Sequence, residues 1–227
     1  MKETVMNEHK DGTVSRVPGV IVSGVSKTIK GNRVLDGINA VFPAARISGI
    51  RGHNGSGKTM LLRAIAGLIS VDEGSIEVFG QTLGRGGFPK GLGYMIEPLE
   101  LWEEFTGSEM LLMLSSLREK PDRHRVDDVL VRVGLNPDDV RRIKSYSLGM
   151  RRRLNLAQAL MGNPCLLLLD EPTNALDENG QEAMSRVLID ERNRGTTIIV
   201  VSHDREELDR IADIQFIMSE GRLREVR

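Results

Sequence analysis

The segment at residues 52–59 carries the residue types and spacing that bind a polyphosphate. It contains Gly52, His53, Asn54, Gly55, Ser56, Gly57, Lys58 and Thr59. Glycines let the backbone turn tightly, so that several N–H groups converge on one point, and a following helix directs its positive end there. We expect Lys58 to reach the outer phosphates of a nucleotide, and the Thr59 hydroxyl to complete a Mg²⁺ shell between two of them. A glycine-rich turn with a chance lysine fits less well, because the pattern stands between a strand-like and a helix-like segment.

Two carboxylates follow a run of leucines at residues 166–169. A continuous apolar strand is typically buried on both faces, and Asp170 and Glu171 come where such a strand emerges at the carboxyl edge of a sheet. We expect Asp170 to hold Mg²⁺, directly or through water, and Glu171 to orient or deprotonate a water molecule that attacks the terminal phosphate. Taken alone, the same residues would fit an ordinary strand end with an acidic turn about as well.

His203, Asp177 and Cys165 are further side chains with candidate chemistry. His203 follows the strand-like segment 196–201, so we predict that it bonds the terminal phosphate or the attacking water, although a single histidine is often structural. Asp177 precedes a helix-like segment, and it could either cap that helix or act at the site. Cys165 is the only cysteine; we expect a small buried side chain, and no disulfide can form within the chain.

Alternating strand-like and helix-like segments must position these residues. Apolar segments that predict strands stand at 45–50, 91–96, 165–169, 196–201 and 214–218, and helical periods stand at 60–68, 148–161, 179–193 and 206–211. This alternation predicts right-handed crossovers and a largely parallel sheet, with ligands gathered at the carboxyl ends of its strands.

Two regions depart from the alternation. Short strands are predicted near the start of the chain and after the first helix, at 20–25, 33–35, 38–42 and 75–79. Between about residues 99 and 146 the sequence predicts helices, at 107–117 and 126–133, with Thr106 as a cap and no clear strand. We therefore expect a helical insertion in a sheet domain, preceded by a loose, charged leader at residues 1–17.

Composition limits the remaining function classes. The chain has 227 residues, with 31 basic and 32 acidic side chains and a formal net charge of -1, so we expect one domain, or a lobe with an insertion, and no nucleic-acid partner. The basic run at 151–153 reads as a partly solvated helix face, with Arg153 in internal ion pairs. No apolar run approaches the roughly 20 residues that cross a bilayer, and the N-terminus is polar, so we expect a soluble intracellular protein.

The order of these motifs resembles the nucleotide-binding subunit of an ATP-binding cassette (ABC) transporter, over about residues 20–221. The resemblance implies an α/β phosphate-loop NTPase fold with a largely parallel core sheet, an N-terminal antiparallel β subdomain and a helical insertion at about 99–155, in one domain of residues 18–227. It places a signature segment at Ser147, Leu148, Gly149 and Met150. That segment would contact the ATP of a second subunit in a head-to-tail homodimer or heterodimer.

The resemblance also gives roles to other residues. It places Asp177 in the D-loop, Thr28 and Ile29 at the nucleotide, and Glu97 in the coupling loop. Where the family commonly has glutamine this chain has Glu97, a carboxylate that would bind Mg²⁺ more strongly, at the cost of crowding the two acids with negative charge. The alternative is a solvent-facing loop acid.

Other departures point to a subgroup of the family. The first glycine of the usual signature is replaced by Leu148, and His53 replaces a common proline. Ile29 stands where the family usually stacks an aromatic ring on adenine, which weakens stacking. Glu97 and the Ser-Leu-Gly-Met signature, with Trp102 and residues 106–107 downstream, are similar to bacitracin-resistance and lantibiotic-immunity exporters.

The resemblance implies an ATPase that uses ATP and Mg²⁺, has Glu171, His203 and Lys58 as catalytic residues, and powers a separate integral-membrane permease as an exporter. Such a protein would be cytoplasmic and peripheral, at the inner face of the cell membrane through its permease. A soluble cassette, such as an iron–sulfur-assembly-type ATPase, is the alternative. A phosphotransferase kinase is a third candidate, but it would need an acceptor pocket and would not need Ser147 or His203.

Overall fold

The computed structural model of the protein describes residues 18–97, 101–117, 121–174 and 176–226. The predicted leader at residues 1–17 lies outside the described residues. That the chain divides into this leader and a single domain of residues 18–227 stays a prediction.

A six-stranded sheet forms the centre of the fold. Its strands are β3 (Ile47–Arg51), β6 (Leu92–Met95), β7 (Leu166–Asp170), β8 (Thr197–Val201), β9 (Ile214–Ser219) and β10 (Arg222–Glu225), in the order β10-β9-β3-β8-β7-β6. Neighbouring strands are parallel except for β10 and β9, which confirms the predicted largely parallel sheet. Ile50 and Asp170 both pair with Val201, so β3, β7 and β8 end at the same edge.

A second sheet is antiparallel. It contains β1 (Pro18–Ile29), β2 (Asn32–Pro43), β4 (Glu73–Val78) and β5 (Gln81–Thr82), in the order β2-β1-β4-β5. This confirms the N-terminal antiparallel subdomain, but the division of β2 into two strands at 33–35 and 38–42 is wrong. The strand continues through Gly37, which has a φ of 60° and donates its N–H to Ser26 Oγ at 3.1 Å. The Asp-Gly pair thus forms a bulge instead of a turn.

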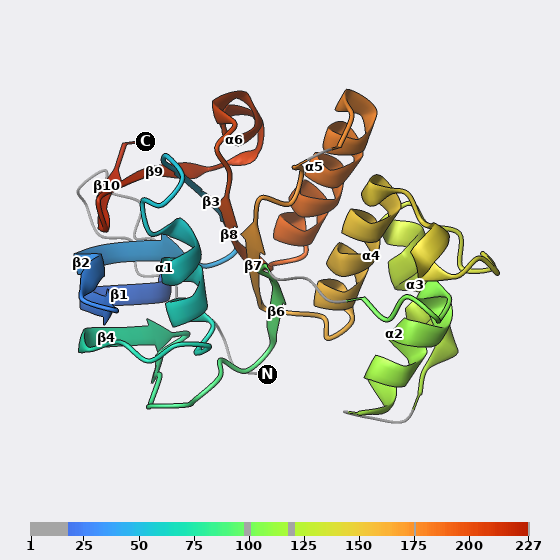
Figure 1. The fold of residues 1–227 in the computed structure, drawn as a ribbon, viewed down its shortest axis with the longest axis horizontal. Coiled ribbons are helices and arrows are strands. Elements are labelled where there is room, and N and C mark those ends of the chain that lie inside the picture. The colour runs from blue at the N-terminus through green and yellow to red at the C-terminus, as the bar shows by residue number, and fades with distance from the viewer. Residues whose placement is uncertain (1–17, 98–100, 118–120, 175, 227) are drawn as a thin grey trace, which may run out of the picture.

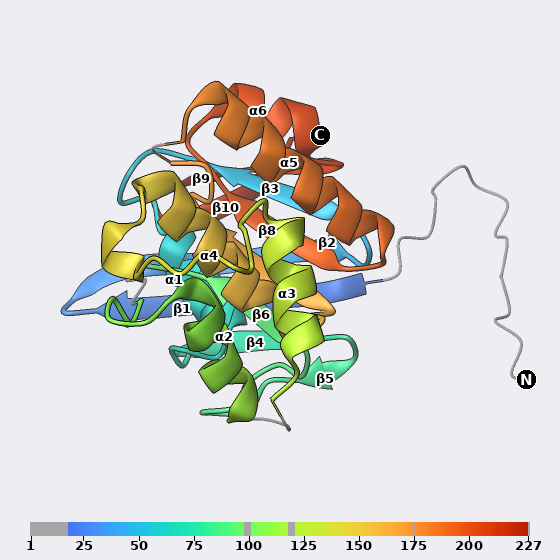
Figure 2. The ribbon, with the colours of Figure 1, turned by 90° about the vertical axis from the view of Figure 1, so that its right-hand side faces the viewer.

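Among the described residues, three helices pack against the sheets, and three others form a group whose last helix also packs against β6. The first set is α1 (Lys58–Ile65), α5 (Glu178–Asn193) and α6 (Arg205–Ile211); the second is α2 (Gly107–Ser116), α3 (Arg123–Arg132) and α4 (Leu148–Leu160), with a short 3₁₀ turn at Ile143–Ser145. The second set gathers at the end of the molecule opposite the antiparallel sheet (Figure 1), and it faces the viewer in Figure 2. This group confirms the predicted helical insertion.

Capping residues explain where the inserted helices begin. Thr106 Oγ1 accepts a hydrogen bond from the Glu109 N–H at 3.2 Å, and Glu109 Oε2 accepts one from the Thr106 N–H at 2.8 Å. This reciprocal pair is a capping box, which satisfies two backbone donors that the first turn of α2 cannot use. The side chain of Asp122 accepts from the Arg125 N–H in the same way at the start of α3. The prediction of Thr106 as a cap is therefore confirmed.

The strand β7 separates two apolar clusters. All its residues are buried. Leu167 and Leu169 pack in the cluster that contains the helical insertion, whereas Leu166 and Leu168 pack in the cluster that contains α1 and the antiparallel sheet. Burying each leucine contributes roughly 2 kcal/mol. The unbroken leucine run is therefore explained by a strand that is covered on both faces.

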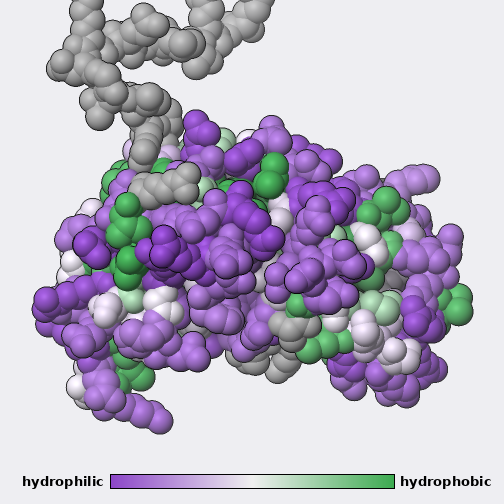
Figure 3. All heavy atoms as spheres, turned by 90° about the horizontal axis from the view of Figure 1, so that it is seen from above, coloured by the Kyte–Doolittle hydropathy of each residue, from purple (hydrophilic) through white to green (hydrophobic). Residues whose placement is uncertain are grey.

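Some local predictions are wrong. Cys165 is exposed, although its backbone pairs on both sides: its N–H donates to the Gly91 carbonyl oxygen at 2.9 Å, and its own carbonyl oxygen accepts from the Thr197 N–H at 2.9 Å. The strands β5 and β10 were not predicted, and α1 ends at Ile65 rather than at residue 68. The molecular face in Figure 3 is mainly hydrophilic, with scattered apolar side chains. Within the described ranges, no helix combines the length and apolar character needed to cross a bilayer.

A candidate nucleotide site at the ends of three strands

A cavity of about 530 Å³ opens at the carboxyl edge of the six-stranded sheet. Its volume lies in the usual range for small-molecule sites, about 300–1,000 Å³. The glycine-rich loop, Asp170 and Glu171 line it together with Glu97 and Ile29. The structure thus brings together, around one hollow, residues that stand more than 100 positions apart in the sequence.

Two glycines of the loop that joins β3 to α1 leave no room for a side chain. A Cβ atom on Gly52 would lie 2.2 Å from the Met218 carbonyl oxygen, and one on Gly57 would lie 2.5 Å from that of Val34. Gly57 is also the N-cap of α1, and no side chain caps that helix. Its first N–H groups are therefore available to an anion, as expected for a phosphate site.

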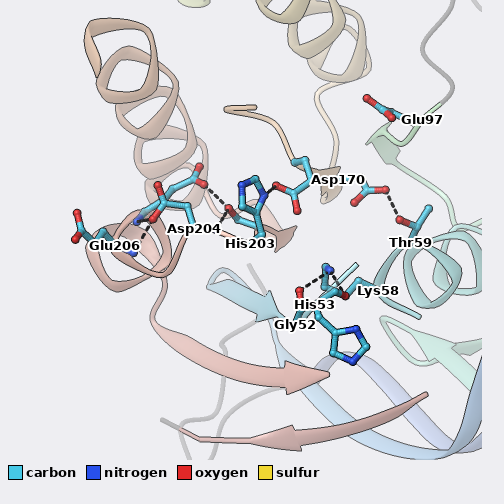
Figure 4. A network of polar contacts seen from close by, with 12 residues as sticks. Gly52, His53, Lys58, Thr59, Glu97, Asp170, His203, Asp204 and Glu206 are labelled. Atoms are coloured by element: carbon cyan, nitrogen blue, oxygen red, sulfur yellow. Dashed lines mark hydrogen bonds and ion pairs between the residues drawn. The ribbon is translucent and has the colours of Figure 1, made fainter. Parts of the chain in front are cut away.

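Lys58 is held inside the loop. Its Nζ donates to the carbonyl oxygens of Gly52 at 2.7 Å and His53 at 3.0 Å, and the residue is only 7% exposed (Figure 4). A buried ammonium group needs such acceptors, and phosphate oxygens supply stronger, charged ones. The Ser56 hydroxyl is buried without a hydrogen-bond partner among the described residues. Both side chains fit a bound polyphosphate.

Thr59 and Asp170 meet directly across the cavity. Thr59 Oγ1 donates to Asp170 Oδ2 at 2.7 Å (Figure 4). Burial raises the pKa of Asp170, while the bond from Thr59 opposes the rise and the charges of Glu171 and Glu97 add to it. A hydroxyl and a carboxylate are the hard oxygen donors that Mg²⁺ prefers, and a cation would relieve the crowded negative charge.

Few protein ligands would hold that cation. Within the described part of the chain, no three histidine, cysteine or acidic side chains converge as a metal cluster. Mg²⁺ is usually bound through one or two carboxylates, with substrate phosphates and water completing the shell. The Thr59–Asp170 pair fits this kind of site, and it does not fit a cage made by protein alone.

Glu171 and His203 form a second pair at the next strand ends. His203 Nδ1 lies 2.7 Å from Glu171 Oε2, with 62% of the histidine side chain exposed and 19% of the glutamate. The backbone holds Glu171 firmly, because its N–H donates to the Val201 carbonyl oxygen at 2.9 Å, and the residue has a φ of 50°. A carboxylate at Nδ1 makes that nitrogen the protonated one, which leaves Nε2 as an acceptor in the neutral ring.

A buried acid supports the loop that carries His203. Ser202 Oγ donates to Glu207 Oε2 at 2.6 Å, and the same Oγ accepts from the Asp204 N–H at 3.0 Å. Burial raises the pKa of Glu207, against the bonds from Ser202 and Thr173 that lower it. These residues frame His203 on both sides. They were missed because Ser202 and Glu207 carry no pattern that distinguishes them from ordinary strand-end and helix residues.

The predicted Mg²⁺ ligand Glu97 points toward the helical insertion. Its Oε1 accepts from Arg152 Nη2 at 2.9 Å, and its backbone oxygen accepts from Arg63 Nη2 at 2.6 Å. It still lines the cavity, so its role at the metal stays a prediction. Among the residues that the structure describes, Arg153 donates to the Gly134 carbonyl oxygen at 3.4 Å in place of the expected ion pairs, whereas Arg152 pairs with Glu97.

The signature residues lie away from this cavity. Ser147 caps α4 by accepting from the Met150 N–H at 3.2 Å, and Leu148 is 53% exposed. None of Ser147, Leu148, Gly149 and Met150 is among the residues that line the described cavity. Their predicted contact with a nucleotide therefore needs a second subunit.

The remaining predicted residues have local roles as well. Asp177 caps α5, because its Oδ1 accepts from the Gly180 N–H at 2.8 Å. Thr28 donates its N–H to Asp72 Oδ2 at 2.7 Å, while Ile29 lines the cavity. Asn174 also lines the cavity, and no sequence pattern singled it out.

The fold and the site together define a phosphate-loop nucleotide-binding protein of the α/β class. A protein-family model described as "ABC transporter" matches residues 35–174. An uncharacterized ABC transporter ATP-binding protein of Bacillus subtilis, YybJ, is 42% identical over 203 residues, which cover 89% of this chain and 93% of that protein. The bacitracin transport ATP-binding protein BcrA of Bacillus licheniformis is 33% identical, over 88% of this chain and 67% of its own length.

The architecture agrees with these relatives. The dimeric structure of MJ0796, described as a bacterial ABC transporter cassette, superposes with a TM-score of 0.83 at 23% identity, and covers 92% of this chain and 98% of that chain. This chain belongs to the ABC transporter family, as an ATP-binding ATPase subunit. The resemblance inferred from the motifs is thereby confirmed, and the transporter function is favoured over the soluble alternative.

Proposed function

We propose that the chain hydrolyses Mg²⁺-ATP at the described cavity to power a separate membrane permease that exports its substrate. One observation supports this site above all: the ends of β3, β7 and β8 lie at one edge of the sheet, and they bring together Lys58, the Thr59–Asp170 pair and the Glu171–His203 pair. The direction of transport is inferred from the similarity of Glu97 and the Ser-Leu-Gly-Met signature to those of bacitracin-resistance and lantibiotic-immunity exporters, and a relative named for bacitracin transport agrees with that substrate class.

Each side chain takes one step of this reaction. Lys58 exchanges its loop carbonyls for oxygens of the outer phosphates, which positions them. Thr59 and Asp170 would hold Mg²⁺, which would supply positive charge against the phosphates. Glu171 accepts the proton of the attacking water, and His203 orients the Glu171 carboxylate through Nδ1.

A second subunit completes the site in this proposal. Ser147, Leu148 and His203 are exposed, so they are available to a partner chain. The Ser147 hydroxyl oxygen caps its own helix, and its proton stays free to donate to a phosphate across the dimer. Hydrolysis then requires dimer closure, which links ATP turnover to the permease at the inner face of the membrane.

Two substitutions test the assignment. Glu171→Gln keeps the shape of the side chain but cannot accept a proton, so we expect turnover to fall about 10²–10⁴-fold while ATP binding persists. Lys58→Ala removes the phosphate contact, and both binding and turnover should weaken. Glu182→Gln, which changes an exposed acid paired with Arg186, is the matched control. ATPase rates and equilibrium binding of labelled ATP would decide, and full steady-state turnover by Glu171→Gln would refute the assigned base.

The transport assignment needs its own measurement. Purification of the chain from membranes should recover a hydrophobic permease, and addition of Mg²⁺-ATP to Glu171→Gln should convert monomer to dimer on size exclusion. Recovery with soluble scaffold proteins alone would instead support the iron–sulfur-assembly type of ATPase.

A further inference from the structure

Glu97 stands between two hollows of the molecule. It lines the nucleotide cavity, and it also lines a second hollow of about 460 Å³ beside the start of α4. Trp102, Arg151 and Arg152 line the second hollow. Figure 4 shows the Glu97 side chain away from the paired Thr59 and Asp170. One carboxylate therefore has access to two different environments.

Arg152 holds this carboxylate on the side of the second hollow. Its side chain is 11% exposed, against 59% for that of Glu97, and their Nη2 and Oε1 atoms lie 2.9 Å apart. The other terminal nitrogen, Nη1, is buried without a hydrogen-bond partner among the described residues. A buried guanidinium needs acceptors, so Glu97 is a principal acceptor of Arg152, while the exposed Glu97 side chain has room to turn.

The backbone of Glu97 is fixed at the same time. Arg63, on the helix that follows the glycine-rich loop, donates Nη2 to the Glu97 carbonyl oxygen at 2.6 Å. The main chain therefore stays beside the nucleotide cavity while the side chain is held by α4. Glu97 and Asp170 line the same cavity, so a rotation of the Glu97 side chain would change the electrostatic field at the metal position.

We propose that Arg152 is a positioning residue that competes with the metal site for the Glu97 carboxylate. Glu97 turns toward bound Mg²⁺-ATP only when its ion pair with Arg152 opens. Because α4 begins at the signature residues, this exchange ties the position of that helix to the metal affinity of the cavity. The inference deepens the proposed function and rests on it.

The neighbouring arginine provides a matched control. Arg151 also lies on α4 and pairs with an exposed acid, Glu103, with Nη1 and Oε1 2.5 Å apart. Glu103 does not line the nucleotide cavity. Substitutions Arg152→Gln and Arg151→Gln therefore remove the same charge from adjacent positions, and only the first releases a carboxylate toward the metal.

The test measures binding of a labelled, non-hydrolysable ATP analogue to the full chain across a Mg²⁺ series. Arg152→Gln should lower the half-saturating Mg²⁺ concentration about two- to fivefold, the size expected for losing a half-exposed ion pair. Arg151→Gln should leave it unchanged. In a Glu97→Gln background, the further change Arg152→Gln should have no effect. Fluorescence of Trp102, the only tryptophan, reports the opening of the pair independently of turnover.

Three results would overturn the inference: no shift for Arg152→Gln, an equal shift for Arg151→Gln, or a shift that persists when residue 97 is glutamine. If Arg152→Gln does not fold, Arg152→Lys, which keeps the charge but loses the planar fork, goes through the same cycle and should shift the Mg²⁺ requirement in the same direction by less. Wild-type protein that binds the analogue without any Mg²⁺ dependence would instead refute the proposed metal site itself.

Discussion

Replacing Gly57 by alanine should destabilise the protein more than the same change at Gly55, although both glycines belong to one loop. Gly55 has a φ of 81° and Gly57 a φ of 107°, so alanine is strained at both positions. A left-handed conformation costs a residue with a Cβ atom about 1–2 kcal/mol. Alanine also lowers the conformational entropy of the unfolded chain by the same amount at both positions. The backbone strain and the entropy effect are therefore common to the two variants, and they cancel when the variants are compared.

The difference between the two sites comes from the space around the new methyl group. A Cβ atom on Gly55 would meet nothing within 4 Å, whereas one on Gly57 would lie 2.5 Å from the Val34 carbonyl oxygen. A real Cβ atom keeps at least 3.0 Å from such an oxygen, so the new methyl group or the Val34 carbonyl must move by at least 0.5 Å. Overpacking of this kind costs about 1–3 kcal/mol. For a domain of this size, each kcal/mol lowers the melting temperature by about 2–4 °C.

We therefore expect Gly57→Ala to melt about 2–12 °C below Gly55→Ala. Thermal unfolding of the nucleotide-free protein, followed by circular dichroism, measures this difference without the stabilisation that a ligand adds. Gly195→Ala, with a φ of 97° and open space around it, is a second control outside the site and should match Gly55→Ala. Equal melting temperatures for residues 55 and 57 would show that the Val34 carbonyl does not limit the loop.

Two further predictions concern buried charge. Burial raises the pKa of Glu207 above its ordinary value of 4.5. The protonated Glu207 therefore stabilises the folded protein fully below pH 4.5, and this stabilisation is lost as the pH rises through the folded pKa. Glu207→Gln cannot ionise, so the free energy of unfolding of this variant, measured with urea at a series of pH values, should fall less from pH 4.5 upward than that of the wild type; parallel curves would contradict this. Glu191 is only 4% exposed, and its carboxylate accepts hydrogen bonds from Arg132 and Arg194. Arg132→Leu should therefore lower the free energy of unfolding in urea by about 1–3 kcal/mol. Arg186→Leu, at an exposed position, should change it by less than about 0.5 kcal/mol.

Patterns that are local in the sequence predicted the site well. The glycine-rich loop and the two acids at the end of β7 were recognised because a strand end fixes where the next side chains lie, and parallel strands end together. The structure places Lys58, Thr59, Asp170 and Glu171 around one cavity, as this reasoning requires.

The errors come from features that no short pattern encodes. Cys165 was expected to be buried because it adjoins an apolar run, but the strand β7 begins one residue later. Gly37 after an aspartate has the composition of a turn, and the pairing partner of the strand decides that it is a bulge. The Glu97–Arg152 contact joins residues 55 positions apart, so only the packing of α4 beside β6 reveals it.

The left-handed backbone of Glu171 has a consequence for engineering. At a φ of 50°, glycine or asparagine would suit the backbone better, and glutamate carries a strain of about 1–2 kcal/mol. A search for thermostable variants would therefore favour replacing this residue, and such a replacement would remove the acid that we propose as the base for ATP hydrolysis. Robustness and activity compete here within one side chain.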